Sequence, residues 1–296
     1  MRLLIVQERG HHEMDAAYRE ALSFQKAFRA IGSEATVWGP GYPNFRVPFA
    51  EVESGCDAIL VLQNYNFTWL PALATSRKLK IFWSIDSHCA LGSHVNFCAK
   101  HKIQVLLNST ERYLPYFRNV AERSHWFPNC FPDDLVRPLP AVPKQYDLGF
   151  VGNHLNRKWW LDELAAKFGM KVVAFKSPEG PNYDAIGYNM VRWINSFKIH
   201  FNRNIADDIN YRTFETLGCK TLLLTNATPG LERLFEVGRH LVTYGDFADL
   251  GDRINYLLRN WAAAQEIAEA GYQHVKKHHT FRNRAEQLRT IIAEVS

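Results

Sequence analysis

An arginine and a glutamate spaced three residues apart carry the most informative chemistry in the sequence. Arg212 and Glu215 lie in residues 210–218, which we predict to form a short helix because Gly218 is a good helix terminator. Residues three apart share one face of a helix. Arg212 offers a planar fork of donors suited to phosphate, and Glu215 offers acceptors for sugar hydroxyls. Such a pair suggests a nucleotide diphosphate sugar as ligand.

The segments around this helix predict half of a parallel α/β sheet. Residues 198–201 and 221–225 are short apolar runs typical of buried strands, and a polar loop beginning at Asn202 connects the first run to the helix at Asn210. Such sheets bind ligands at loops that leave their strand ends, and a helix N-terminus favours an anion. A solvated ion pair on a surface helix explains Arg212 and Glu215 equally well, so spacing alone leaves both interpretations open.

A second strand end carries a glycine and two cations. Residues 146–151 predict a strand, which is followed by Gly152, Asn153 and then Arg157 and Lys158. Glycine permits close approach of the backbone to a phosphate, and either cation could neutralise it.

An acid and an imidazole follow another predicted strand, residues 80–85. Asp86 and His88 would stand where parallel sheets bind ligands, with His88 able to accept a proton and Asp86 able to orient or replace it. The alternative is that Asp86 caps the next segment and His88 packs. Rivals for an acidic or basic role lie in the first loop, but they match no specific motif: Glu8, His11 and His12.

Alternating strands and helices predict a parallel doubly wound N-terminal half. A helix is expected over residues 16–31, where apolar residues recur near helical spacing until Gly32. The strands are expected at residues 3–6, 35–38, 57–62, 80–85 and 104–107. In the second half, strands are expected at residues 146–151, 171–175, 198–201 and 221–225, and helices at residues 159–168 and 280–294.

Length and composition bound the function. A chain of 296 residues suits two domains, and 47% hydrophobic with 22% charged residues is ordinary for a globular protein. The formal charge of +5 fits an anionic substrate but is too small and too scattered to indicate nucleic acid. No run of about eighteen apolar residues exists, so no membrane span is expected.

Cysteine and histidine usage predicts a cytoplasmic protein without a metal site. Five scattered cysteines form no disulfide pattern, and an odd number fits a reducing compartment. The first residues predict a strand, not a secretion signal. One stretch gathers possible ligands at spacings that match no paired zinc pattern: His88, Cys89, His94, Cys98 and His101.

Residues 210–225 resemble a known motif. They are similar to the N-x-R-x-F-E-(x)2-(A/G)-x-G pattern of glycosyltransferases of the spore-maturation-protein (CgeB-like) type, which belong to the GT-B class. Residues 150–157 resemble the F-V-G-x(n)-R segment of the same family. Residues 230–235, 238–246, 250, 267–271 and 279–284 agree with it. Cys219 and Lys220 depart from the pattern, which more often has a small residue and then glycine.

The resemblance implies an architecture. Two Rossmann-like doubly wound domains would face each other across a cleft, with residues 1–140 holding the acceptor and residues 141–279 the nucleotide sugar. Residues 280–296 would form a helix that crosses back to the first domain. The proline-rich residues 138–143 would be the hinge, and residues 177–188 a loop that helps to hold the base.

The resemblance also implies an activity. The protein would move a sugar from a nucleotide diphosphate sugar, first of all a UDP-sugar, to an unknown acceptor. The donor would be held by Gly152, Asn153, Arg157, Asn202, Asn210, Arg212 and Glu215. Arg157 and Arg212 would also stabilise the leaving diphosphate, so that no divalent metal or other cofactor is required.

Asp86, His88 and Arg212 are the predicted catalytic residues. Asp86 or His88 would act as base if the reaction inverts configuration, and would stabilise the transition state or position the sugar if it retains it. Two other classes stay open: a nucleotide-sugar epimerase on the same fold, and a non-catalytic scaffold or coat protein. No nucleic-acid partner is expected, since no basic run with interleaved aromatics occurs.

Overall fold

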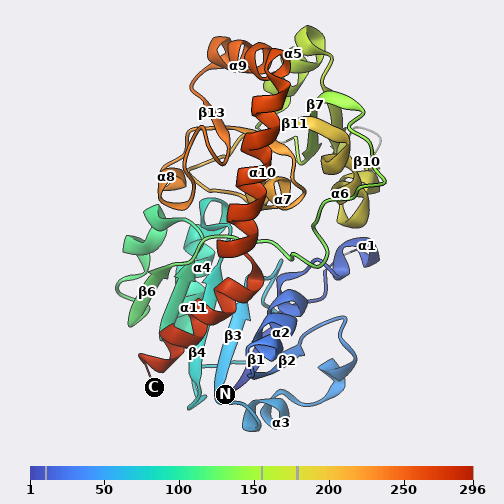
Figure 1. Ribbon diagram of the computed structural model, residues 1–296. Coiled ribbons are helices and arrows are strands. Elements are labelled where there is room, and N and C mark those ends of the chain that lie inside the picture. Colours follow the sequence, from blue (N-terminus) through green and yellow to red (C-terminus); the bar gives the residue numbers. More distant parts are fainter. Residues whose placement is uncertain (11, 155, 178–179, 296) are drawn as a thin grey trace. The chain divides into compact units, whose positions relative to one another are not determined.

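The chain forms two compact units, each built on a parallel sheet (Figure 1). A computed structural model describes residues 1–10, 12–154, 156–177 and 180–295. The N-terminal unit comprises Met1–Asn129 and Phe281–Ser296, and the C-terminal unit comprises Cys130–Thr280. The two units describe how the chain packs. They do not test the domain limits expected after residues 140 and 279, which stay predictions.

The N-terminal unit contains a six-stranded parallel sheet in the order β2-β1-β3-β4-β5-β6. The strands are β1 (Arg2–Val6), β2 (Glu34–Trp38), β3 (Ala58–Leu62), β4 (Leu79–Ser84), β5 (Val105–Asn108) and β6 (Arg123–Trp126). The first five are confirmed, because apolar runs buried on both faces identify strands of a parallel sheet. The edge strand β6 was not predicted, since its sequence is polar and its residues are half-buried or exposed.

The helices of this unit are α1 (Glu13–Ala16), α2 (Glu20–Ala30), α3 (Phe49–Ser54), α4 (Ser87–His101) and α11 (Phe281–Ala293), with 3-10 turns at Pro43–Arg46 and Glu111–Phe117. The single helix expected over residues 16–31 is wrong at its start. Arg19 is extended, and α2 begins at Glu20, where the Gln7 side chain binds the first two residues of the helix. Gln7 donates to the Glu20 carboxylate at 2.8 Å and accepts the Ala21 N–H at 3.0 Å.

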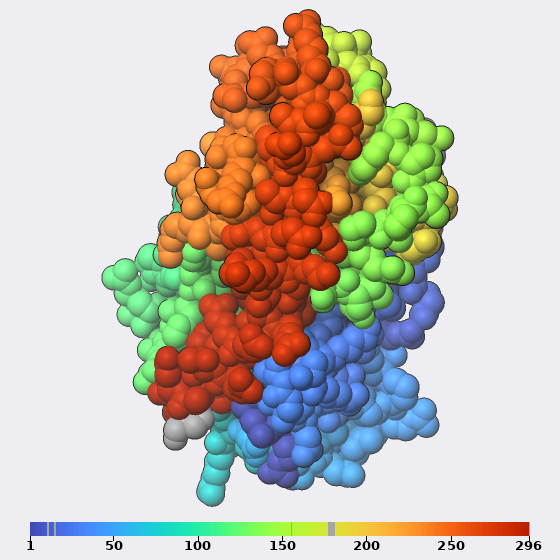
Figure 2. Space-filling view, in the orientation of Figure 1, coloured from blue at the N-terminus to red at the C-terminus, as the bar shows by residue number. Residues whose placement is uncertain are grey.

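The C-terminal helix α11 belongs to the N-terminal unit. It packs on α2, and Figure 2 shows its dark red surface next to the blue surface of that segment. Phe281 meets the ring of Phe24 edge-on at 5.0 Å, and Arg284 donates to the carbonyls of Pro128 and Asn129. A buried arginine bound to two carbonyls fixes the start of the helix.

The C-terminal unit contains a five-stranded parallel sheet in the order β13-β12-β11-β7-β8. Its strands are β7 (Tyr146–Gly152), β8 (Lys171–Ala174), β11 (Phe197–Phe201), β12 (Leu222–Asn226) and β13 (Val242–Tyr244), and β9 (Lys176–Ser177) pairs with β10 (Gly180–Pro181) as a separate hairpin. The four predicted strands are confirmed within a residue or two. Because β8 lies on one side of β7 and β11 on the other, the sheet has its topological switch point between β7 and β11.

The helices of this unit are α5 (Lys158–Phe168), α6 (Gly187–Ser196), α7 (Tyr211–Gly218), α8 (Leu231–Leu234), α9 (Phe247–Arg259) and α10 (Trp261–His278), with a 3-10 turn at Tyr183–Ala185. The central helix α7 has the predicted limits, with Asn210 as its N-cap residue. The loop expected over residues 177–188 is partly wrong, because α6 already begins at Gly187; residues 178 and 179 lie outside the described residues.

Both units therefore confirm the predicted class of parallel, doubly wound α/β structure. Among the described residues, no helix combines the length and apolar character that crossing a bilayer requires.

Gly149 leaves room for the ring of Phe197 from the neighbouring strand. A Cβ atom at Gly149 would lie 2.2 Å from the ring of Phe197 on the neighbouring strand. We therefore expect Gly149→Ala to destabilise the protein by about 1–3 kcal/mol, the usual cost of overpacking a core, and thermal unfolding would measure it. Gly92→Ala is the control, because no atom lies within 4 Å of its added Cβ. An unchanged melting temperature in Gly149→Ala would contradict this account.

Candidate functional site

The loops at the switch point of the C-terminal unit carry most of the predicted donor-binding residues. Gly152 is the last residue of β7, and Asn202 directly follows β11. Arg212 lies in the first turn of α7. Because β7 and β11 are neighbours and parallel, the loops that follow them leave the same edge of the sheet.

Arg212 is held in place by three groups. Its Nε donates to the carbonyl of Val151 at 3.0 Å, and its Nη1 contacts the sulfur of Met190 and forms an ion pair with Glu215. The side chains of Arg212 and Glu215 are only 20% and 12% exposed. The predicted ion pair therefore exists, but it is mostly buried, so the interpretation as a solvated surface pair is wrong. A half-buried pair orients the guanidinium more firmly than an exposed one.

Gly152 occupies a backbone conformation that favours glycine. Its φ is +147°, and an added Cβ would lie 3.5 Å from Nε of Arg212. Asn153 follows, and its carbonyl accepts a hydrogen bond from Nη1 of Arg157 at 3.1 Å. The turn thus brings backbone close to one guanidinium and binds a second.

Arg157 and Arg203 complete a group of three arginines. Arg157 precedes α5 and donates from Nε to the carbonyl of Arg203 at 2.8 Å. Burial, followed by the positive charge of Arg212, lowers the pKa of Arg157 to about 10. Such a shift means that burial and repulsion destabilise the charged guanidinium, and a bound anion would offset this destabilisation. These three arginines are called the arginine cluster below.

Arg203 was missed by the sequence analysis. Its guanidinium stacks on Trp160 of α5 at 4.2 Å from the ring centroid. The available signal was its position directly after Asn202, in the loop that leaves a central strand. The distant aromatic partner could not be read from the sequence.

Asn202 and Asn210 support the loop from within. Asn202 is 1% exposed, and its amide nitrogen donates to Thr225 and to Asn204 at 3.2 Å each. The two asparagines also exchange amide hydrogen bonds at 3.3 and 3.4 Å. Asn210 makes no side-chain hydrogen bond to the first turn of α7. The side chain of Asn202 therefore shapes the loop, while α7 begins without a side-chain cap.

The same loop contains a strained turn. Ala206 and Asp207 both have positive φ, 53° and 63°, although neither is glycine. Non-glycine residues in this conformation cost free energy and persist where the surrounding structure enforces them, often at functional sites.

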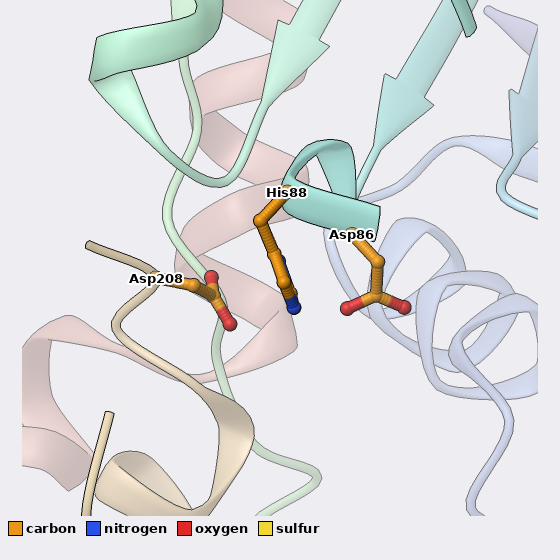
Figure 3. A group of neighbouring side chains, drawn as sticks. All are labelled: Asp86, His88 and Asp208. Atoms are coloured by element: carbon orange, nitrogen blue, oxygen red, sulfur yellow. The ribbon is translucent and has the colours of Figure 1, made fainter. Parts of the chain in front are cut away.

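Asp86 and His88 lie together at the start of α4 in the N-terminal unit. Figure 3 shows both side chains leaving this first turn in the same direction. Asp86 is the N-cap residue but makes no side-chain capping bond, so the capping alternative is wrong. Burial raises the pKa of Asp86 above its usual range, and the neighbouring His88 opposes this rise.

Gln63 fixes the carboxylate of Asp86. Its Nε2 donates to Oδ2 of Asp86 at 2.8 Å, while its Oε1 accepts the N–H groups of Ile85 and Asp86 at 2.9 and 2.7 Å. Gln63 follows β3 just as Asp86 follows β4, which explains why parallel pairing brings them together. The sequence analysis did not single out this residue.

Glu8 of the first loop is held by hydrogen bonds within the N-terminal unit. Glu8 is 8% exposed, accepts the N–H of Tyr65 and donates its own N–H to Asn64 at 2.8 Å. His12 is half-buried, and His11 lies outside the described residues.

Two of the three histidines of α4, His94 and His101, form hydrogen bonds within the protein. Nδ1 of His94 lies 2.7 Å from the hydroxyl of Ser84, which also contacts Ser87 at 2.5 Å. Nδ1 of His101 accepts the N–H of Leu73 at 3.2 Å. Burial lowers the pKa of both rings, that of His94 to about 4. These rings therefore serve as neutral hydrogen-bonding groups, His94 near the Asp86 turn and His101 at the other end of α4.

Residues 156–290 match a protein family described as "Glycosyl transferase-like". The chain has a GT-B fold. A comparison with curated sequences finds no match.

Solved structures with this fold match over nearly the whole chain. Sucrose-phosphate synthase from Thermosynechococcus elongatus has a TM-score of 0.70 at 11% identity, covering 99% of this chain and 98% of the other. Anabaena HepE in complex with UDP-glucose has a TM-score of 0.63 at 12% identity, covering 99% and 100%. An α-glucosyltransferase in complex with UDP has a TM-score of 0.70 at 12% identity, covering 99% and 100%.

Other structures of the α-glucosyltransferase contain DNA. They give no support to the expectation that nucleic acid is excluded as a partner.

The buried His94 makes a pH-dependent contribution to stability. Because its pKa is about 4 in the folded chain and about 6.5 in an unfolded one, the unfolded state binds more protons between these values. Stability is therefore lost as the pH falls from 7 to 4.5, by about 2 kcal/mol from this residue. Urea unfolding of wild type and His94→Asn at both pH values should show their difference in stability shrinking by that amount. A difference that stays constant with pH would refute the assignment.

Proposed function

We propose that the protein is a glycosyltransferase that transfers a sugar from a nucleotide diphosphate sugar. The observation that carries this proposal is the arginine cluster at the switch point of a GT-B fold, where burial and mutual repulsion already lower the pKa of Arg157. A diphosphate supplies the negative charge that this cluster lacks. UDP is the first candidate nucleotide, since several proteins of this fold were solved with it.

The donor diphosphate would be bound by Arg157, Arg212 and the backbone at Gly152 and Asn153. The start of α7 at Asn210 would add its dipole, and Glu215 would accept a hydroxyl of the ribose or sugar. Arg212 would also act in the chemistry, because negative charge grows on the leaving diphosphate as the glycosidic bond breaks. Fixed guanidinium groups provide the stabilisation that a divalent metal gives elsewhere, so we propose a metal-independent reaction.

The acceptor would be bound by the N-terminal unit, with Asp86 and His88 as the reacting pair. A carboxylate whose pKa is raised by burial accepts a proton more readily near neutral pH. Gln63 would keep its oxygens correctly directed. We also propose that the enzyme is of the spore-maturation type and that it is cytoplasmic.

The donor site is tested by calorimetric titration with UDP, GDP, dTDP and CDP. We expect one nucleotide to bind wild type, and its affinity to fall about 10- to 100-fold in Arg212→Ala, the usual effect of losing hydrogen bonds to a charged group. Arg253→Ala is the control, because Arg253 is an exposed arginine paired with Asp249 on α9.

Repeating the titration with EDTA tests the metal-independent proposal, which requires an unchanged affinity. If no nucleotide binds, or if Arg212→Ala binds as well as wild type, the scaffold alternative replaces this proposal.

The role of Asp86 is tested by hydrolysis of the donor sugar nucleotide that binds. We expect Asp86→Asn to slow hydrolysis about 100-fold or more, the usual contribution of a general base, while the nucleotide affinity stays within twofold of wild type. Wild-type hydrolysis rates in the variant would remove Asp86 from the mechanism. Interconversion of the nucleotide sugar without an acceptor would instead indicate an epimerase.

A further inference from the structure

His200 is a fully buried histidine in β11 whose two ring nitrogens both have partners. Nε2 accepts the N–H of Val151 on β7 at 3.3 Å. Nδ1 lies 2.5 Å from the hydroxyl of Thr216 on α7. Because Nε2 is an acceptor, the proton of the neutral ring must be on Nδ1, which therefore donates to Thr216.

Val151 connects this ring to the arginine cluster. Its N–H binds His200, and its carbonyl accepts the hydrogen bond from Nε of Arg212. Arg212 and Thr216 lie one turn apart on α7, so the hydrogen bonds close a ring that joins β11, the end of β7 and α7. Gly152 directly follows Val151. Displacement of the Val151 backbone would therefore move both the turn at Gly152 and the guanidinium of Arg212.

The protonation state of His200 suits a fixed acceptor. Burial, followed by the charges of Arg212 and Lys144, lowers its pKa well below the usual range. A charged ring would direct an N–H at the N–H of Val151, so the contact requires the neutral form.

We propose that His200 is a positioning residue for the donor site, which holds the Val151 peptide so that Arg212 and the Gly152 turn face the diphosphate together. The inference rests on the proposed function. It goes beyond packing, because a phenylalanine would fill nearly the same space among the neighbouring rings of Phe150 and Phe197 but would make neither hydrogen bond.

Three substitutions separate the two hydrogen bonds of the ring. His200→Gln can place its carbonyl oxygen near Nε2 and keep the Val151 contact, His200→Asn can reach only toward Thr216, and His200→Phe makes neither contact. We expect the UDP dissociation constant to rise at least tenfold in His200→Phe and His200→Asn, and to stay within threefold of wild type in His200→Gln. Equal loss in all three variants, or wild-type affinity in His200→Phe, would overturn the proposal.

Thr216→Val gives a second test that preserves the shape of the core. It removes the hydroxyl that receives the Nδ1 proton, and we expect a three- to tenfold weaker UDP affinity; an unchanged affinity would contradict the closed ring of hydrogen bonds. His101→Phe is the matched control. It replaces another buried neutral histidine that accepts a backbone N–H, in the N-terminal unit, and should lower the melting temperature without changing UDP binding.

A readout without nucleotide distinguishes this inference from the proposed function. In ligand-free protein, hydrogen exchange at Nε–H of Arg212, followed by NMR, should be faster in His200→Phe than in wild type and in His101→Phe. Faster exchange in a protein that binds no nucleotide would uphold the positioning role and refute the donor site. Unchanged exchange would refute the positioning role itself.

Discussion

The arginine cluster imposes the strongest physical constraint on this structure. Arg157, Arg203 and Arg212 carry like charges and are partly buried, so their repulsion is stronger than in water. The protein offsets this cost with contacts that leave the charges in place. Arg157 and Arg212 donate to backbone carbonyls, Arg203 stacks on Trp160, and Glu215 neutralises part of the charge of Arg212. Under the proposed function, a site held in this way would be prepared for the diphosphate before it binds.

The two units use the same topology for opposite chemistry. In each sheet the next strands are added first on one side and then on the other side of one strand, which is β1 in the first sheet and β7 in the second. Polar side chains follow strands in this part of each sheet. The C-terminal unit places guanidinium groups there. The N-terminal unit places a carboxylate, Asp86, whose burial raises its pKa and whose orientation depends on Gln63. Shared topology determines where a site can form, and the side chains determine what it can bind.

Glycosyltransferase structures of the GT-B fold match this chain at only 11–12% identity, yet they cover nearly all of it. Such conservation of fold without sequence is expected, because a parallel sheet requires buried apolar strands rather than particular residues. The residues that decide a ligand are few. Gln63 and His200 accept the backbone N–H groups of Asp86 and Val151, and under the proposed function they would act on the site through those two residues.

Local sequence determined nine strands of the two parallel sheets and the central helix, but not β6 or β13. Short apolar runs bounded by turn residues favour strands that are buried on both faces, and Gly218 ends α7 where predicted. The positions of Arg212, Glu215 and Gly152 at strand and helix ends followed from the same signals. Tertiary structure alone decided the start of α2, which depends on Gln7, and the existence of the polar edge strand β6. It also decided the contacts of Arg203, Gln63 and His200, because their partners lie 16 or more residues away and no local pattern encodes such pairing.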